Sequence, residues 1–450
     1  MLSFTSSDPV LQDGFAWAQA QALSYARHGE DPVGLWYDAA LPGRDAFCIR
    51  DASHQRAGAA VLGLREHTCN MFRKFAQSMH EARDFCMFWE IDKWDRPAPV
   101  DYTDDRDFWY NLPANFDLIQ ACHAEALWTG DRRYLEEPCF ARLEALTFGE
   151  YIARWDRDGD GLPDHRPENG RRGIASYNEV KKSPRVAGDL LGAMFAAYRA
   201  AGLESKAQAL QKLYLDEWYN VKRGRFYGAK DKRGRFVEKY CREGNFLPIY
   251  FGLLDGTPHL RGALEDVRAH GPANVEAKTY FPQLYYGRGF EEDGLRELRE
   301  LCDPRLKRRE YPEVSFAVAG VLVNQYLGLT VPELGLLRTL SGVPEGDLAA
   351  AEGIPVLGTE VSLRQEGQRG TALHLADAGR AVRWRACFLG EYDMLACNEK
   401  NRPALHVQDA AGRTVSYIEL DLPAGGEVTV TARTRNSHWP GNSARSQGSV

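Results

Sequence analysis

The chain has 450 residues, of which 44% are hydrophobic and 26% are charged, and its formal net charge is −7. This length suits one large domain and a smaller one, and the composition is typical of globular proteins. The acidic balance argues against a nucleic-acid partner, because binding phosphate groups requires a concentrated basic surface.

The first residues contain no basic segment followed by an apolar run, so no signal peptide is visible. No apolar stretch approaches the roughly 20 residues that a membrane-spanning helix requires. We therefore expect a cytoplasmic protein without a membrane partner, and its oligomeric state stays open. The cysteines number nine and form no CxxC pair, which indicates reduced, buried thiols.

Apolar residues at helical spacing predict about twelve helices along the first three quarters of the chain. Prolines directly after polar residues mark helix starts at Asp8-Pro9, Ser183-Pro184 and Thr257-Pro258. The expected helices run near residues 9–28, 52–64, 69–88, 113–129, 138–155, 184–201, 204–220, 244–254, 258–269, 279–287, 291–302 and 313–327.

The connections between these predicted helices alternate between short and long. Short ones lie at Gly130-Asp131, Gly202-Leu203 and Asp255-Gly256. The long ones cover residues 29–51, 89–112, 156–183, 221–243, 270–278 and 303–312. Because short links join antiparallel neighbours, all the long loops should meet at one end. We therefore expect a mainly α fold, an (α/α)6 toroid of six helical hairpins over residues 1–340, with a functional cleft at the long-loop end.

The pattern changes after about residue 345 to short segments of strand composition separated by turns. These segments are 371–375, 381–389, 404–408, 415–421 and 427–433, with a hairpin turn at residues 409–412. They predict a small C-terminal antiparallel β-sandwich over residues 341–434. The polar stretch 435–450 is expected to be a disordered tail.

Acidic and aromatic residues gather in the six predicted long loops, which suits carbohydrate binding. Aromatic rings pack against the C–H faces of sugars, and carboxylates and amides bind the hydroxyls. The candidate substrate-binding residues are Arg50, His54, Trp94, Asp107, Trp109, Tyr110, Asn111, Tyr177, Glu243, Tyr280 and Tyr311. For Asp51, Asp107 and Glu313, interaction with a helix dipole is the alternative explanation. For His54, the alternative is a helix-start histidine that binds a neighbouring carboxylate.

Other reaction classes find little support in the sequence. No histidine pair has the spacing of a zinc site, and no GxSxG or glycine-rich phosphate loop is present. We therefore expect no organic cofactor. Glycoside hydrolysis would instead need two carboxyl groups, one protonated to assist the leaving group and one to activate water or attack the sugar.

One acidic loop has the spacing of a calcium site. Asp156, Asp158, Asp160 and Asp164 occupy positions one, three, five and nine of a calcium-loop pattern, with a glycine at position six. Position twelve is Pro167 rather than the bidentate Glu of an EF-hand. The pattern therefore indicates a shorter structural calcium loop, and the alternative is an acidic turn without metal.

Two segments resemble the six-hairpin glycosidase superfamily, which includes glucoamylases, processing glucosidases, trehalases, α-L-rhamnosidases and β-glucosidases of the bile-acid type. The first is DRDGDGLPD at residues 156–164, after the fifth predicted helix, and the second is YPEVSFAVAGVLVNQYLGL at residues 311–329. The resemblance covers roughly residues 10–335, and the C-terminal strands resemble the β-sandwich of rhamnosidases. No subfamily is matched.

The resemblance implies positions for the two carboxyl groups. In glucoamylase-like members the general acid lies between helices five and six, and the general base lies between helices eleven and twelve. The matching loops offer Asp164, Glu168 and Glu179 for the acid, and Glu310 and Glu313 for the base. We favour Glu179 as acid and Glu313 as base. The tryptophan and motif context of the named families is not reproduced around them, so Asp51, Glu90 and Glu276 remain candidate catalytic residues.

The leading hypothesis is an exo-acting glycoside hydrolase that acts on an oligosaccharide or glycoside. Rhamnosides, glucosides and uronosides are the candidate substrates, and the carboxylate of a uronoside could bind Arg44, Arg50, Lys278 or Arg288. One alternative is a polysaccharide lyase or sugar epimerase on the same fold, with Tyr280, Tyr311 or His54 abstracting a proton. A second alternative is a non-catalytic carbohydrate-binding protein.

Overall fold

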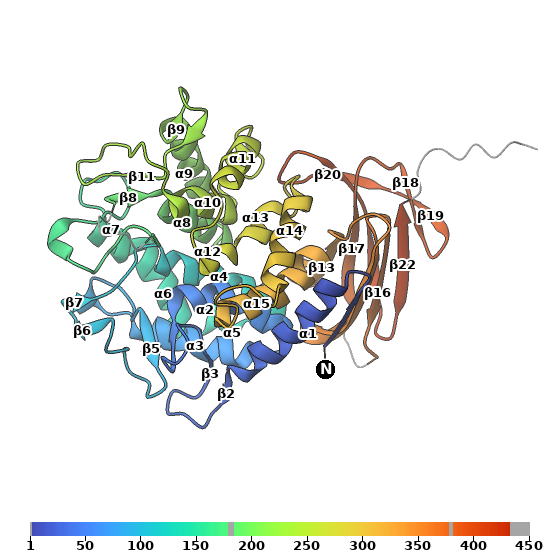
Figure 1. Ribbon diagram of the computed structural model, residues 1–450, viewed down its shortest axis with the longest axis horizontal. Coiled ribbons are helices and arrows are strands. Elements are labelled where there is room, and N and C mark those ends of the chain that lie inside the picture. The colour runs from blue at the N-terminus through green and yellow to red at the C-terminus, as the bar shows by residue number, and fades with distance from the viewer. Residues whose placement is uncertain (1, 179–183, 378–380, 433–450) are drawn as a thin grey trace, which may run out of the picture.

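A computed structural model describes residues 2–178, 184–377 and 381–432 (Figure 1). Two predictions lie outside these residues, namely the general acid Glu179 and the disordered tail 435–450. Within the described residues, no helix combines the length and the apolar character that crossing a membrane requires. All nine cysteines are free thiols and most are buried, as predicted.

Helices dominate the chain from residue 9 to residue 326, and every predicted helix overlaps at least one of them. They are α1 (Pro9–Ser24), α2 (Ile49–Val61), α3 (Arg65–Ser78), α4 (Ala114–Thr129), α5 (Arg133–Glu136), α6 (Pro138–Leu146), α7 (Ile152–Trp155), α8 (Gly188–Ala200), α9 (Glu204–Glu217), α10 (Arg242–Tyr250), α11 (Leu260–His270), α12 (Val275–Lys278), α13 (Phe281–Tyr285), α14 (Glu291–Cys302) and α15 (Pro312–Val321). The π-helical turn 147–151 joins α6 to α7, and a second one, 322–326, extends α15.

The capping chemistry read from the sequence explains the start of α1. Asp8 accepts a hydrogen bond from the backbone N–H of Val10 at 3.0 Å, and Pro9 occupies the first turn. The other two proline signals are less accurate, because α8 and α11 begin a few residues after Pro184 and Pro258.

The predicted helix 69–88 ends early, at Ser78, and this difference matters for the site. The backbone leaves the helical conformation at Met79, where ψ is 125°, and positive φ angles of 54° and 61° at Asp84 and Phe85 then turn the chain. The Ser78 hydroxyl accepts a hydrogen bond from the N–H of Phe88 at 2.9 Å and so holds the returning chain. The chain then enters strand β5 (Glu90–Asp92), which pairs with β4 (Ala46–Cys48).

The helices contact one another in an orderly sequence. Helix α15 contacts α2, α2 contacts α4, α4 contacts α8, α8 contacts α10, α10 contacts α13, and α12 contacts α15. The remaining long helices pack behind this set, as α1 does on α15 and α9 on α8. Figure 1 shows these helices grouped together, beside a layered set of strands that includes the C-terminal part of the chain.

Two glycines bring α2 and α15 unusually close together. A Cβ atom on Gly58 would lie 2.0 Å from the carbonyl oxygen of Phe316, and one on Gly320 would lie 2.9 Å from the backbone nitrogen of Gly58. Because only glycine allows such an approach, these two positions, which lie toward the ends of α2 and α15, set how closely the two helices pack.

The C-terminal strands form two sheets. One has the order β1-β14-β15-β16-β22-β18-β19 and the other β12-β13-β17-β21-β20. Their strands are β1 (Ser3–Ser6), β12 (Leu329–Glu333), β13 (Leu336–Leu340), β14 (Leu348–Val356), β15 (Thr359–Glu366), β16 (Gly370–Leu375), β17 (Val382–Leu389), β18 (Met394–Cys397), β19 (Lys400–Pro403), β20 (Leu405–Gln408), β21 (Thr414–Leu422) and β22 (Glu427–Ala432). Buried side chains of both sheets, such as Leu373 and Trp384, share one hydrophobic core.

The predicted strands and the hairpin turn at 409–412 all occur, but two features differ from the expectation. Strands β13 and β17 pair in parallel, so the sandwich is not wholly antiparallel. The chain between them crosses to the other sheet through β14, β15 and β16, and this crossover allows the parallel return. In addition, β1 pairs with β14, and β12 and β13 precede residue 341, so strand pairing extends across the predicted domain boundary.

Short two-stranded ribbons complete the helical part. They pair β2 (Ala26–His28) with β3 (Leu35–Tyr37), β6 (Tyr102–Asp104) with β7 (Asp107–Phe108), β8 (Val186–Ala187) with β11 (Ala229–Lys230), and β9 (Tyr219–Asn220) with β10 (Arg225–Phe226). These ribbons stiffen the long connections between the helices.

Candidate active site

A cavity of about 1670 Å³ lies where the long connections meet. Its lining comes from six parts of the chain: 40–54, 89–109, the described residues 177, 178 and 184, 229–247, 270–280 and 308–313. Each part contains one of the predicted long loops or the helix start that follows it. The predicted meeting of the long loops around one cleft is therefore confirmed.

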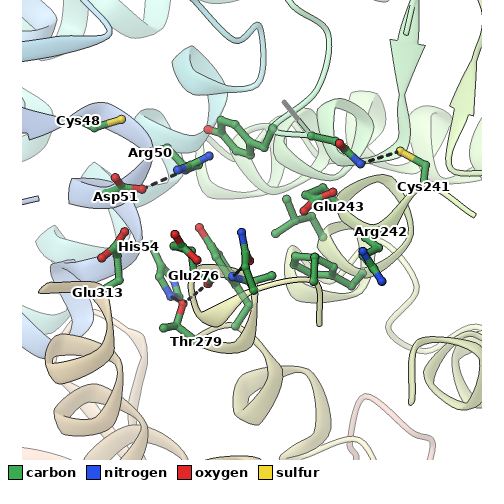
Figure 2. A pocket seen from close by; sticks show the side chains of 18 of the residues that line it. Cys48, Arg50, Asp51, His54, Cys241, Arg242, Glu243, Glu276, Thr279 and Glu313 are labelled. Carbon is green, nitrogen blue, oxygen red and sulfur yellow. Dashed lines mark hydrogen bonds and ion pairs between the residues drawn. The ribbon is translucent and has the colours of Figure 1, made fainter. Parts of the chain in front are cut away.

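Most of the predicted site residues within the described chain line this cavity. They are Arg50, Asp51, His54, Glu90, Trp109, Tyr177, Glu243, Glu276, Tyr280, Tyr311 and Glu313. Figure 2 shows Asp51, His54 and Glu313 on one side of the cavity and Arg242 and Glu243 on the other. We call the region of Asp51, His54 and Glu313, which are all buried, the buried end.

Four predicted substrate-binding residues do not belong to the lining, and each has another contact. Trp94 is 54% exposed on the surface, and Asp107 forms an ion pair with Arg171 at 2.7 Å. Tyr110 and Asn111 are fully buried behind the wall. The side-chain oxygen of Asn111 accepts a hydrogen bond from the indole N–H of Trp109 at 2.7 Å, so Asn111 orients Trp109 instead of reaching a ligand.

Two carboxyl groups lie side by side at the buried end (Figure 2). Asp51 stands in the first turn of α2 and Glu313 in the first turn of α15, the two helices that the glycines bring together. Asp51 accepts a hydrogen bond from the Nε–H of Arg50 at 3.0 Å. Glu313 is 4% exposed, and its Oε2 atom is buried without a hydrogen-bond partner among the described residues. An unpaired buried oxygen is costly, which points to a ligand that supplies a donor there.

Burial raises the pKa of Glu313, and the negative charges of Asp51 and Glu276 add to the effect, while Arg50 opposes it. Glu313 therefore holds its proton more firmly than an ordinary glutamate. The pair combines one carboxyl group that favours its neutral form with one that forms an ion pair with an arginine.

A third carboxyl group, Glu276 of α12, faces the same space. Its Oε2 atom is buried and has no partner in the described part of the chain. One of its oxygens lies 3.5 Å from the guanidinium of Arg308. The carboxyl groups of α2, α12 and α15 therefore converge from three separate parts of the chain.

His54 contacts three neighbouring side chains at the buried end. Its ring stacks on Tyr280, with centroids 3.7 Å apart and an interplanar angle of 15°. Its Nε2 lies 2.9 Å from the Thr279 hydroxyl, which itself donates to the carbonyl oxygen of Glu276 at 2.6 Å. Since that hydroxyl proton is already used, we assign the ring proton to Nε2, where it donates to Thr279. Nδ1 then faces the hydroxyl of Tyr250 at 3.4 Å. Burial lowers the pKa of His54 to about 3, so the ring is neutral.

Aromatic rings form another part of the wall. The hydroxyl of Tyr177 donates to Asp117 at 3.0 Å, and its backbone N–H donates to Asp189 at 2.5 Å. The guanidinium of Arg50 lies 5.9 Å from the centre of the Tyr177 ring. Trp89 and Trp109 also line the cavity. Such rings suit the C–H faces of a sugar.

Glu90 belongs to a separate group in the wall, together with Arg44 and Asp101. The Arg44 guanidinium lies 2.8 Å from Glu90 and 4.0 Å from Asp101. Burial and the neighbouring Asp101 raise the pKa of Glu90. The early end of α3 and the pairing of β5 with β4 place Glu90 here, and the helical pattern of residues 69–88 did not reveal that turn.

Sequence reasoning missed one whole side of the cavity. Residues 231–242 supply Lys232, Arg233, Lys239 and Arg242, all exposed, together with Tyr240. Only the end of this loop, Glu243, was predicted. The dense run of lysine and arginine between residues 230 and 242 was the available signal.

Three of the four predicted calcium ligands come together outside the cavity. Asp156, Asp158 and Asp160 each offer an oxygen, and these oxygens lie within 4.8 Å of one another. Asp164 does not join them, because it is buried and binds Arg166 at 2.7 Å and Arg185 at 2.9 Å. Oxygen ligands of this kind suit calcium, which would need further oxygens beyond these three. The Asp156 carboxylate also accepts three backbone N–H groups of its own turn, as an acidic turn without metal would.

No family model matches the sequence, and no curated protein matches it. Solved structures do share its fold. A GH78 family rhamnosidase of Bacillus sp. GL1 is 13% identical with a TM-score of 0.57, and the match covers 83% of this chain and 41% of that one. A putative kojibiose phosphorylase from the human microbiome is 8% identical with a TM-score of 0.57, over 93% of this chain and 63% of that one. A rhamnosidase from Klebsiella oxytoca with rhamnose bound is 13% identical with a TM-score of 0.52, over 71% of this chain and 64% of that one.

The chain thus spans less than two thirds of the length of each of these proteins. At such low identity the likeness shows the fold alone. The predicted resemblance is confirmed only as a fold shared with two rhamnosidases and a putative phosphorylase, and the subfamily stays open.

Proposed function

We propose that the chain is a glycoside hydrolase that cleaves a glycosidic bond at the buried end of the cavity. The observation that carries the proposal is the pair Asp51 and Glu313, with the unpartnered buried oxygen of Glu313, in a cavity walled by aromatic rings. Glycoside hydrolysis requires a carboxyl group that holds a proton and a second one that is ionised. The proton passes to the leaving oxygen as its bond to the sugar breaks, and water completes the sugar product.

We further propose Glu313 as one member of the catalytic pair. The resemblance assigns it the role of base, whereas the raised pKa suits a proton donor in the ligand-free protein. Its proposed partner is Glu179 by the resemblance, or Asp51 by proximity. An acid and a base produce opposite limbs of a pH–rate profile, so the limb that disappears in Glu313→Gln assigns its role.

The proposed fold is the six-hairpin toroid predicted from the sequence. The order of helix contacts supports it, since α15, α2, α4, α8, α10 and α13 contact in succession and α12 contacts α15. In such a ring the starts of the inner helices lie at one end, as Asp51, Glu243 and Glu313 do around the cavity.

We also propose that calcium binds in the turn of Asp156, Asp158 and Asp160, where it would stabilise the conformation of the loop.

The lyase and epimerase alternative has weaker support. It needs a tyrosine or histidine base aimed at the substrate, but both ring nitrogens of His54 already contact hydroxyl groups. Tyr280 is stacked on His54, and burial raises its pKa, which disfavours the ionised form.

The test is a panel of aryl glycosides and oligosaccharides that contain rhamnose, glucose or a uronic acid at the non-reducing end. We expect release of free sugar from at least one substrate, without any added cofactor. Formation of an unsaturated product that absorbs in the near ultraviolet, with no release of saturated sugar, would contradict the proposal and favour a lyase. Binding without turnover of any substrate would favour a carbohydrate-binding protein.

A further inference from the structure

We propose that the exposed side of the cavity binds an anionic group, so that the substrate is an acidic saccharide. We call this side the basic rim and define it as Lys232, Arg233, Lys239 and Arg242. The anion is a carboxylate or sulfate carried by the sugar next to the one that is cleaved. This inference rests on the proposed function and names the substrate class of the same site.

The four cations of the basic rim are exposed and line the cavity. None of their side chains forms an ion pair or a hydrogen bond with any residue that the structure describes. Neighbouring acids are already occupied, since Asp231 pairs with Arg235 at 2.8 Å and Glu238 pairs with Arg223 at 2.9 Å. The basic rim therefore has positive charge available for a ligand.

The cations that the sequence suggested for a uronic acid do not provide this charge. Each has an acidic partner: Arg44 binds Glu90, Arg50 binds Asp51, Lys278 binds Glu297 and Glu300, and Arg288 binds Asp255. Lys278 and Arg288 are also absent from the lining. In this proposal the basic rim, and not these four cations, binds the anionic group of the substrate.

The two sides of the cavity differ in charge, although Glu243 lies on the same side as the four cations of the basic rim. Asp51, Glu276 and Glu313 face the buried end, where a second negative charge would be repelled. Arg242 lies across the cavity from Asp51 and Glu313 (Figure 2). A neutral sugar therefore suits the buried end, and an anionic sugar suits the basic rim.

An aromatic pair at the basic rim supports binding of a sugar ring there. Tyr240 stacks on His270 with centroids 3.7 Å apart and an interplanar angle of 5°, and both residues line the cavity. Tyr240 directly follows Lys239 in the chain. A flat ring surface beside cations matches a sugar ring that carries a negative group.

The experiment compares pairs of disaccharides in which a terminal rhamnose or glucose is linked either to glucose or to glucuronic acid. We expect kcat/KM to be about tenfold higher for the glucuronic acid member, and this preference to shrink at high salt. The double variant Lys239→Gln/Arg242→Gln should lose the preference, so that the ratio of kcat/KM for the two members falls to about one. Lys222→Gln is the matched control, because Lys222 is an exposed cation in the same loop that does not line the cavity.

Several outcomes would overturn the inference. Equal cleavage of both members, unchanged in the double variant, would refute it and leave the proposed function standing. Cleavage that requires inorganic phosphate and yields a sugar phosphate would place the anion in a co-substrate instead. If neither member is cleaved, calorimetric titration of the wild-type protein measures the binding affinity of each member and tests the basic rim independently of catalysis. Equal affinity for both members would refute the basic rim as an anion site.

Discussion

The carboxyl group of Glu313 lies in surroundings that disfavour its ionised form. Its Oε2 atom is buried and has no hydrogen-bond partner in the described part of the chain. A second carboxyl group lies beside it, and a third lies close by. Stability alone does not explain such an arrangement, because each feature costs free energy of folding. A ligand that donates hydrogen bonds to these oxygens would explain it.

This cost predicts a dependence of stability on pH. The folded-state pKa of Glu313 lies above the unfolded value, so the folded protein binds more protons between the two values and loses stability as the pH rises through that interval. Glu313→Gln cannot titrate, and we expect it to be more stable than wild type near pH 8 but not near pH 4, by about 1.4 kcal/mol per unit of raised pKa. Urea denaturation of both proteins across this range measures the difference. A stability difference that does not change with pH would contradict the assigned environment.

Single residues of the site were predictable only in part. Asp51, Glu276 and Glu313 stand in the first turns of α2, α12 and α15. The sequence predicted such a position for Glu313, but it placed Asp51 and Glu276 in the long loops 29–51 and 270–278. Tyr110 and Asn111 occur in the same kind of loop but point into the interior. Which side of an irregular loop faces the cavity depends on tertiary packing, which local composition does not encode.

At the scale of elements, the close crossing of α2 and α15 sets the distance between Asp51 and Glu313. Gly58→Ala would place a Cβ atom 2.0 Å from the Phe316 carbonyl oxygen, and we expect a loss of about 1–3 kcal/mol in stability together with lower activity. Gly262→Ala in α11 is the control, because no atom lies within 4 Å of its added Cβ, and it should stabilise by about 0.5–1 kcal/mol. Thermal denaturation and sugar release of both variants measure these effects. Full activity in Gly58→Ala would show that the crossing does not position the pair.

The acidic turn makes a second prediction at this scale. If Asp156, Asp158 and Asp160 hold calcium, adding the ion after chelation should raise the melting temperature, and Asp160→Asn should remove that rise. Glu168→Gln changes an exposed carboxylate in the same loop outside this group and should respond like wild type. An identical melting temperature with calcium and with chelator would favour the turn without metal.

The predicted helices and five of the strands followed from periodicity and turn signals, whereas most of the other strands were not predicted. The helix 69–88 ended early because the backbone leaves the helical conformation at Met79, where ψ is 125°, and local periodicity did not reveal this change. Strand β14 was not predicted because LAAAEGIPV is rich in alanine and contains Gly353 and Pro355, which have low strand propensity. Backbone pairing with β1 on one side and β15 on the other stabilises β14 as a strand despite this low propensity.

For the whole molecule, the net charge does not indicate how charged groups are distributed in the cavity. The chain carries −7 overall, yet its cavity has carboxyl groups at the buried end and, at the basic rim, cations with no acidic partner among the residues that the structure describes. The overall balance argues only against a nucleic-acid partner, whereas the local charges support the proposed placement of a neutral sugar at the buried end and an anionic sugar at the basic rim. The fold shared with rhamnosidases and a phosphorylase provides the frame for such a cavity.

The most direct test of the central claim is the kcat/KM of Glu313→Gln on the glycoside that wild type cleaves best. We expect a loss of about 100- to 10,000-fold, because a positioned proton transfer contributes that much. Glu125→Gln is the matched control, since Glu125 is also fully buried, has a raised pKa of about 7 and an unpartnered oxygen among the described residues, but lies outside the cavity lining. Near-normal activity of Glu313→Gln, or an equal loss in Glu125→Gln at unchanged stability of both variants, would contradict the account.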